Sequence, residues 1–312
     1  MARDGSDSWD IDESVGATAL GTAAVRAYEL NAESPLFHDP FAHLFLDAVA
    51  QAGSTVQYGG KRPAEFSETD PNLAAFVQTM TNFAAARTKF FDDFAATATD
   101  SGVRQFVFLA AGLDTRAWRL ENLADAVVFE IDQPGVLGFK ADVLTRAAVA
   151  PVSTYVPVPV DLRKNWPNKL QQNGFDDSQP TGWLIEGLLP YLPPVAQIAL
   201  FDHVCQLSAP GSRIVVDGYR PEFFEKKALR ASFDQMARGA GSAGSDSEDR
   251  IYSEELFFTG DRPDVAESLS AQGWFTTGER SIDVMARFGR PAAPSVDRAS
   301  LGSDFIAAVL PG

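Results

Sequence analysis

Acidic side chains follow short apolar segments in the middle of the chain, where they could bind a polar ligand. Asp132 ends the segment VVFEID, Asp161 follows VPVPV and Glu186 follows WLI. In nucleotide-binding folds, a carboxylate at the end of the second strand accepts hydrogen bonds from ribose hydroxyl groups. Glu130 points to the same side of its strand as Asp132, and repulsion between two buried carboxylates can keep one of them protonated. Asp132 is therefore the first candidate for a ribose contact.

A glycine turn precedes this acidic strand. Residues 107–132, VFLAAGLDTRAWRLENLADAVVFEID, read as a strand, a turn at Gly112, a helix and a second strand. Glycine at the turn lets a ligand approach the backbone closely, although Gly112 could also serve only the turn. The dinucleotide pattern G-x-G-x-x-G would require glycine where Ala110 and Thr115 stand, so a nicotinamide cofactor is the weaker alternative.

Four motifs in this region occur in a recognisable order. They are AAGLDTRAWRL at 110–120, FEIDQP at 129–134, PVDL at 159–162 and LIEGLLPYLP at 184–193. From about Arg87 to Tyr219 the chain thus resembles the leucine carboxyl methyltransferase-like group of S-adenosylmethionine-dependent methyltransferases, in its uncharacterised actinobacterial, mycobacterial-type branch. The resemblance implies that S-adenosylmethionine is the cofactor and methyl donor.

The same resemblance implies roles for individual residues. Ala111, Gly112 and Asp132 would contact the cofactor, and Glu186 would lie near its methionine end. Arg87 would pair with the carboxylate of the cofactor, and Asp161 with Leu162 would contact its adenine. The chain departs from the family pattern at Ala110, which replaces a glycine, and this puts the affinity for the cofactor in doubt more than the fold.

Alternatives remain for several of these residues. Arg87 shares a helix face with aromatic residues, but a helix arginine is usually solvated, so a cofactor contact and a solvated position are both open for it. Asp161 could cap the helix that follows it. Arg116 and Arg119 are interpreted as helix-surface or packing residues.

The methyl acceptor must bind beside the methyl group of the cofactor. Transfer from a sulfonium requires mainly alignment and exclusion of water, so no motif marks the acceptor site. By resemblance we expect O-methylation of a carboxylate or hydroxyl on a small molecule or peptide, with Tyr191, Tyr219 and Arg220 as candidates for holding it. The alternatives are a non-catalytic S-adenosylmethionine-binding module or, less favoured, an NAD-dependent oxidoreductase.

Composition excludes several other classes of protein. The 312 residues carry a formal net charge of −16, which argues against nucleic acid as a partner. No apolar run reaches the roughly 18 residues of a membrane-spanning helix, and the acidic N-terminus lacks a signal-peptide pattern, so we expect a cytoplasmic protein. The three histidines are not grouped as metal ligands, and the single cysteine, Cys205, is expected to be a core thiol. The oligomeric state cannot be read from the sequence.

The order of elements predicts an α/β fold, with strands and helices alternating as in a doubly wound sheet. Expected strands are 105–110, 126–131, 153–160, 182–186, 212–217, 273–278 and 304–309. Expected helices are 72–98, 115–123, 134–148, 166–173, 194–208, 222–238 and 263–272. The resemblance implies the Rossmann-like class I methyltransferase variant, whose last strand is antiparallel. We divide the chain into a flexible arm at 1–14, a helical N-terminal cap at 15–100 and a core at 101–312 with a lid insertion at 220–262.

Overall fold

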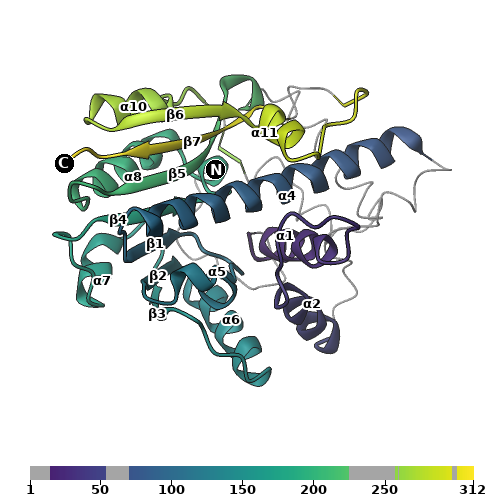
Figure 1. Ribbon diagram of the computed structural model, residues 1–312, viewed down its shortest axis with the longest axis horizontal. Coiled ribbons are helices and arrows are strands. Elements are labelled where there is room, and N and C mark those ends of the chain that lie inside the picture. The colour runs from purple at the N-terminus through teal and green to yellow at the C-terminus, as the bar shows by residue number, and fades with distance from the viewer. Residues whose placement is uncertain (1–14, 54–69, 225–256, 259, 297–300) are drawn as a thin grey trace, which may run out of the picture.

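A seven-stranded sheet forms the centre of the molecule (Figure 1). The computed structural model describes residues 15–53, 70–224, 257–258, 260–296 and 301–312. Its strands are β1 (Gln105–Leu109), β2 (Val127–Asp132), β3 (Thr154–Pro159), β4 (Thr181–Ile185), β5 (Arg213–Tyr219), β6 (Phe275–Arg280) and β7 (Ser303–Val309). They lie in the order β3-β2-β1-β4-β5-β7-β6, and β7 runs antiparallel to both of its neighbours. The predicted doubly wound sheet with an antiparallel last strand is confirmed.

The strands send apolar side chains to both faces of the sheet, which explains their continuous hydrophobic character. On β1, Val107 and Leu109 join one core cluster, whereas Phe106 and Phe108 join the other. Gly182 on the neighbouring strand leaves space for an aromatic ring, because a Cβ atom there would lie 2.5 Å from the ring of Phe106. Both faces of the sheet must therefore be covered by helices.

One face is covered by helices that pack against the first cluster. These are α7 (Trp166–Gln172), α8 (Pro194–Gln206) and α10 (Val265–Ala271). The opposite face is covered by α4 (Pro71–Asp100), α5 (Arg116–Arg119) and α6 (Pro134–Arg146), with α1 (Val15–Glu29) and α2 (Ala42–Gln51) beside them. Short 3-10 turns occur at η1 (Glu121–Leu123), η2 (Leu189–Tyr191) and η3 (Pro221–Phe224).

The long helix α4 crosses the sheet and contacts β4, β5 and β7 (Figure 1). Asp70 caps its N-terminus by accepting a hydrogen bond from the backbone N–H of Leu73, and Pro71 occupies the first helical position, where its missing N–H costs nothing. Because α4 also packs against α1 and η1, it joins the N-terminal helices to the sheet.

Several elements differ from the predictions. The helix expected at 115–123 is a single α turn followed by η1, because the chain extends at Leu120 between them. Helix α11 (Ser281–Arg287) was not predicted; it packs Met285 against Ala86 of α4. Of the helix expected at 222–238, the described part is the end of η3. The predicted arm at 1–14 and most of the lid at 220–262 lie outside the described residues.

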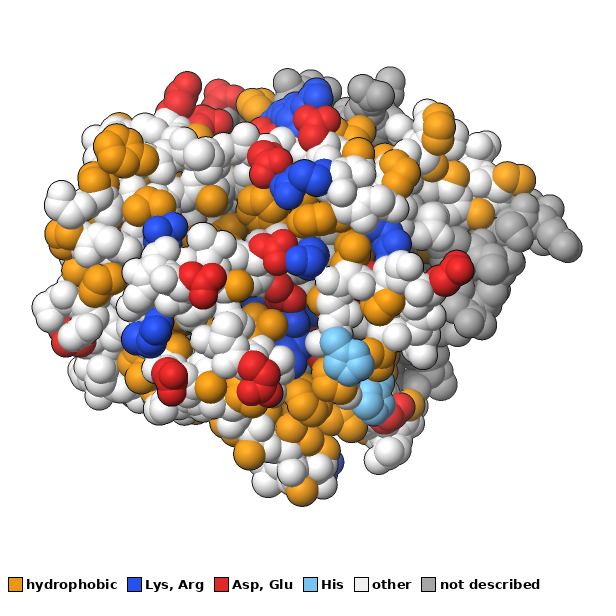
Figure 2. Space-filling model, viewed as in Figure 1, with side chains coloured by type: hydrophobic (Ala, Val, Ile, Leu, Met, Phe, Trp, Pro, Cys, Tyr) orange, Lys and Arg blue, Asp and Glu red, His pale blue; other side chains and the backbone are white. Residues whose placement is uncertain are grey.

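The surface view shows mixed charges rather than one sign. On the face drawn in Figure 2, Lys and Arg side chains lie beside Asp and Glu, with hydrophobic side chains between them. No helix within the described ranges is long and apolar enough to cross a bilayer.

A buried ion pair connects β2 to α6. Lys140 Nζ donates to both carboxylate oxygens of Glu130, at 2.8 and 2.6 Å, and Tyr155 Oη donates to the same carboxylate at 2.9 Å. Burial raises the pKa of Glu130 to about 7, although Lys140 acts in the opposite direction. Nζ also lies 5.0 Å from the ring centroid of Trp118. Glu130 is therefore held by a cation on the helix that follows its strand.

Removing this cation should destabilise the protein. We expect Lys140→Met to lower the free energy of unfolding by about 3–5 kcal/mol, the usual cost of leaving a buried charge without its partner. Urea denaturation measures the change. The double variant Lys140→Met with Glu130→Gln should recover part of the loss, and a single-variant loss below about 1 kcal/mol would contradict the assignment.

Candidate active site

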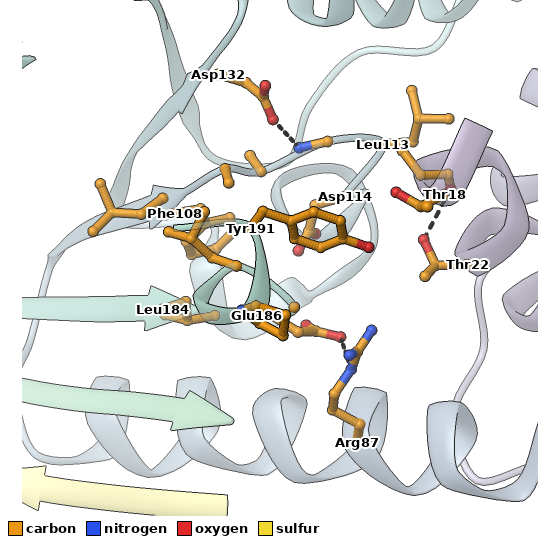
Figure 3. Close-up of a pocket in the computed structure, with 18 of the residues that line it drawn as sticks. Thr18, Thr22, Arg87, Phe108, Leu113, Asp114, Asp132, Leu184, Glu186 and Tyr191 are labelled. Carbon is orange, nitrogen blue, oxygen red and sulfur yellow. Dashed lines mark hydrogen bonds and ion pairs between the residues drawn. The ribbon is translucent and has the colours of Figure 1, made fainter. Parts of the chain in front are cut away.

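A pocket opens at the carboxyl ends of the central parallel strands, where open α/β sheets bind ligands (Figure 3). Residues 108–114 form one part of its lining, and Leu184 with residues 186–188 forms another. Helix α1 contributes Thr18, Thr22 and Arg26, so the pocket lies between the sheet and the N-terminal helices. No sequence motif indicated this contribution of α1, because about eighty residues separate that helix from the glycine turn and only tertiary packing brings the two together.

The glycine turn and the strand-end carboxylate are joined directly. Asp132 Oδ2 accepts a hydrogen bond from the backbone N–H of Gly112 at 2.6 Å, drawn as a dashed line in Figure 3. Its Oδ1 accepts one from the N–H of Gln133 at 2.6 Å. Burial raises the pKa of Asp132, whereas these two bonds lower it. Because each carboxylate oxygen has two acceptor positions, Asp132 retains the capacity to bind ligand hydroxyl groups.

Arg87 is buried under the pocket, so its interpretation as a solvated helix residue is wrong. Its Nε donates to Glu186 Oε1 at 3.0 Å and its Nη1 donates to Asp217 Oδ2 at 3.0 Å. Burial lowers the pKa of Arg87, but the two carboxylates raise it above its usual range. The guanidinium packs over Gly187, where a Cβ atom would lie 3.4 Å from Nη1. Arg87 therefore anchors α4 to the ends of β4 and β5.

Arg116 is the residue that sequence reasoning underestimated. It is buried in the pocket wall, and its Nε donates to Asp92 Oδ1 at 2.7 Å while Nη1 donates to Glu186 Oε2 at 2.8 Å. It also pairs with Asp114, whose pKa burial raises but Arg116 lowers to about 2. The side chain of Arg119 is buried too, and it donates to both carboxylate oxygens of Asp92. The helix-surface reading is wrong for both arginines, and the packing reading is right.

Asp217 was not predicted as a site residue. It is fully buried and accepts hydrogen bonds from the N–H of Gly187 at 2.8 Å, from Arg87 and from Tyr219 Oη at 3.0 Å. Burial raises its pKa to about 6, against the effect of Arg87. Asp217 stands near the end of the strand IVVDGY, and the same strand-end signal that selected Asp132 could have found it.

Aromatic rings line the β5 side of the pocket. Tyr219 lies 4.6 Å from Phe223, Phe223 lies 6.1 Å from Phe257 and Tyr191 lies 5.0 Å from Phe257, measured between ring centroids. All four residues line the pocket. Figure 3 shows the ring of Tyr191 across the pocket between Asp132 and Glu186. The structure thus brings together two of the three residues suggested for the acceptor.

The other predicted residues lie outside the lining of the pocket. Asp161 Oδ2 accepts from Arg163 Nη2 at 2.6 Å, and the following helix α7 is capped by Asn165, not by Asp161. Leu162 packs at the edge of a core cluster. Arg220 Nε donates to Asp304 Oδ2 at 2.9 Å.

The side chains of His203 and Cys205 lie in structural surroundings. Across the described parts of the chain, no three His, Cys, Asp or Glu side chains are grouped as metal ligands. His203 packs against Trp166, with ring centroids 5.8 Å apart. Cys205 is partly buried at the edge of the core and accepts a hydrogen bond from Trp274 Nε1 at 3.2 Å. The contacts of His203 and Cys205 are therefore those of residues that pack within the fold.

Comparisons with known sequences identify the class of enzyme. The sequence pattern of the leucine carboxyl methyltransferase family matches residues 19–205. A protein of Mycobacteroides abscessus is 43% identical over 314 residues, covering 98% of each chain. One of Mycolicibacterium paratuberculosis is 44% identical over 310 residues, covering 99% of this chain and 97% of its own. Both relatives are provisionally named S-adenosyl-L-methionine-dependent methyltransferases.

Solved structures agree on the fold. A crystal structure from Thermobifida fusca, provisionally named a methyltransferase, has a TM-score of 0.50 at 15% identity and covers 97% of this chain and 96% of its own. A DUF574 family protein from Streptomyces avermitilis has a TM-score of 0.51 at 14% identity, with 97% and 99% covered. The fold and the sequence relatives define an S-adenosylmethionine-dependent methyltransferase. The chain belongs to the leucine carboxyl methyltransferase family.

Ala110 occupies the position at which the chain departs from the family glycine. Its φ is +54°, a left-handed conformation that costs a non-glycine residue about 1–2 kcal/mol. Ala148, at φ +53° just after α6, has the same conformation but lies outside the pocket lining.

This pair of alanines provides a matched test. We expect Ala110→Gly and Ala148→Gly each to raise the free energy of unfolding by about 0.5–1 kcal/mol, since relief of strain exceeds the added chain entropy of glycine. Urea denaturation measures both changes. In isothermal titration, Ala110→Gly should bind S-adenosylmethionine more tightly and Ala148→Gly should bind it as the wild type does; equal affinities in all three proteins would show that the Ala110 methyl group is harmless.

Proposed function

We propose that this methyltransferase binds S-adenosylmethionine in the described pocket and transfers its methyl group to an oxygen atom of a small molecule or peptide. The observation that carries the proposal is the hydrogen bond between the backbone N–H of Gly112, in the turn after β1, and the carboxylate of Asp132 at the end of β2. This bond joins a glycine turn, whose backbone a ligand can approach closely, to a buried carboxylate. This is the arrangement that an adenosine ribose requires.

The remaining cofactor contacts follow the order of the strands. Asp132 on β2 would accept the ribose hydroxyl groups, and Ala111 with Gly112 would face the middle of the cofactor from the end of β1. Glu186 after β4 would accept the methionine ammonium group. Two strand spacings separate β2 from β4, or about 10 Å, which matches a ligand extended across the strand ends.

Two further parts of the cofactor depend on residues at the margins of the pocket. Arg87 uses Nε and Nη1 for its carboxylate partners, so Nη2 is the part of the guanidinium that these two bonds leave for a ligand carboxylate. Asp161 and Leu162 would contact adenine beyond the Asp132 end, where Asp161 is close enough to raise the pKa of Asp132. Asp161 already pairs with Arg163, so its carboxylate would have to accept hydrogen bonds from both Arg163 and the adenine amino group.

The protein's task in the reaction is positioning. The cofactor supplies a methyl group on a sulfonium, which is a good leaving group. The buried network around Arg87, Arg116 and Glu186 would hold the methionine end at the floor of the pocket. Tyr191 and the residues of α1 would restrict water above it. Alignment and exclusion of water then account for the rate.

The proposed ribose contact can be tested by binding. We expect Asp132→Ala to weaken S-adenosylmethionine binding by about 1–3 kcal/mol, the scale for hydrogen bonds to a charged group. Isothermal titration calorimetry measures this. Asp125→Ala, an exposed carboxylate just before β2, is the matched control and should bind as the wild type does. Unchanged affinity in a folded Asp132→Ala protein would remove Asp132 from the site.

Catalysis requires a separate measurement. With an acceptor panel of carboxylates and alcohols, we expect S-adenosylhomocysteine to form together with a methylated product, detected by mass spectrometry. Wild-type protein that gives no heat with S-adenosylmethionine but clear heat with a nicotinamide cofactor would contradict the assignment of the pocket.

A further inference from the structure

The charges of the pocket disfavour an anionic acceptor. The arginines of the described lining are Arg26, Arg87 and Arg116. Arg26 pairs with Asp39 at 2.9 Å, Arg87 pairs with Glu186 and Asp217, and Arg116 pairs with Asp92, Asp114 and Glu186. Because the proposed function assigns Nη2 of Arg87 to the cofactor carboxylate, an acceptor carboxylate would have to compete with carboxylates that already hold these cations. A neutral acceptor has no such competition.

The shape and composition of the β5 side suit a planar apolar group. Tyr191, Tyr219, Phe223 and Phe257 contact one another there in a chain of tilted ring pairs. Aromatic walls bind aromatic ligands through offset and edge contacts as well as through burial. The ring of an acceptor would thus find more favourable contacts on this side than a polar peptide would.

The aromatic side is also far enough from the proposed ribose contact. Asp132 is on β2 and Tyr219 is on β5, and β1 and β4 lie between these strands. Three strand spacings amount to about 14 Å, so a cofactor that spans β2 to β4 leaves the β5 side for a second molecule. Donor and acceptor would meet near Glu186 and Tyr191.

A proton-accepting pair faces this second position. Tyr219 Oη donates to Asp217 Oδ2 at 3.0 Å, and Asp217 is fully buried behind it. A hydroxyl oxygen has two acceptor positions beside its one donor, so Tyr219 Oη can accept a hydrogen bond from a ligand hydroxyl while it donates to Asp217. Such a carboxylate, reached through one hydroxyl, can act as a general base.

We propose that the methyl acceptor of this enzyme is an aromatic hydroxyl compound, and that Tyr219 and Asp217 take its proton during transfer. This inference rests on the proposed O-methyl transfer and specifies its acceptor. It assigns Tyr219 as a catalytic residue in contact with the acceptor. Asp217 acts through Tyr219 and is a positioning and proton-accepting residue behind it.

The step balances in atoms and charge. The acceptor oxygen forms a bond to the methyl carbon, and the bond between that carbon and the cofactor sulfur breaks, so its electron pair stays on sulfur and yields neutral S-adenosylhomocysteine. The acceptor proton passes to Tyr219 Oη as the tyrosine proton passes to Asp217 Oδ2. The protonated Asp217 returns its proton to solvent after the product leaves.

Three matched probes test the acceptor class: 4-methylphenol, 4-nitrophenol and 4-methylbenzoate, each incubated with S-adenosylmethionine and followed by mass spectrometry. We expect methyl ethers from the phenols and no methyl ester from the benzoate. Tyr219→Phe should slow methylation of 4-methylphenol by about 100-fold or more, the usual contribution of a general base. At about pH 6, where 4-nitrophenol is still largely neutral, the loss should be much smaller with this phenol, because its more acidic hydroxyl needs less help from a base.

Controls separate this inference from the proposed function. Tyr28→Phe removes a hydroxyl from α1 outside the pocket lining and should leave all rates unchanged. Wild-type protein that binds S-adenosylmethionine but methylates only the benzoate, or none of the three probes, overturns the acceptor class while the donor site stands. Equal losses with both phenols in Tyr219→Phe would refute the proton-accepting role. Failure to bind S-adenosylmethionine would remove both proposals.

The pH profile distinguishes the role of Asp217 from a structural one. Charged and titratable groups that face it are Arg87 from α4, Glu186 after β4, Tyr219 on β5 and Tyr191 in η2. Asp217 must be ionised to accept a proton, so the wild-type rate with 4-methylphenol should fall as pH decreases through the pKa of Asp217. Asp217→Asn should lack this acidic limb, whereas an unchanged limb in a folded variant would show that Asp217 is not the group that titrates.

Discussion

The buried pairing of Arg87 with Glu186 and Asp217 is the interaction on which the rest of the site depends. It joins the long helix α4 to the ends of β4 and β5, and through Glu186 it continues to Arg116 in the helix after the glycine turn. Each of these charges would be costly if it were buried alone. Because every member has a partner, the network can hold carboxylates and guanidinium groups at the floor of a pocket without unfolding it.

The same principle operates at the other end of the pocket. Glu130 lies two residues before Asp132 and is neutralised by Lys140, which leaves Asp132 to interact with the turn at Gly112. Lys140 also lowers the pKa of both Asp132 and Asp114. The charged groups around the pocket are thus coupled in pairs across secondary-structure elements, and this coupling explains how an acidic protein can bury so many carboxylates around one pocket.

Much of the fold could be predicted because its signals are local. Parallel strands that are buried on both faces read as apolar runs, and all seven strands occur within two residues of the expected positions. The short helix α11 escaped prediction because it is held by α4 and β7, which are distant in sequence. Arg87 was ambiguous for a related reason: a helix arginine is solvated or buried according to what lies opposite it, and Asp217 lies 130 residues away.

The sequence alone determined the class of fold, the family and the strand-end carboxylate Asp132, since these follow from periodicity, turn chemistry and ordered motifs within short segments. Tertiary structure decided which charges meet. It brought Arg116 into the pocket wall, placed Asp217 behind Arg87 and Tyr219 and set Arg220 against Asp304. The physical reason is that the energy of a buried charge depends on partners a few ångströms away, and those partners come from distant parts of the chain.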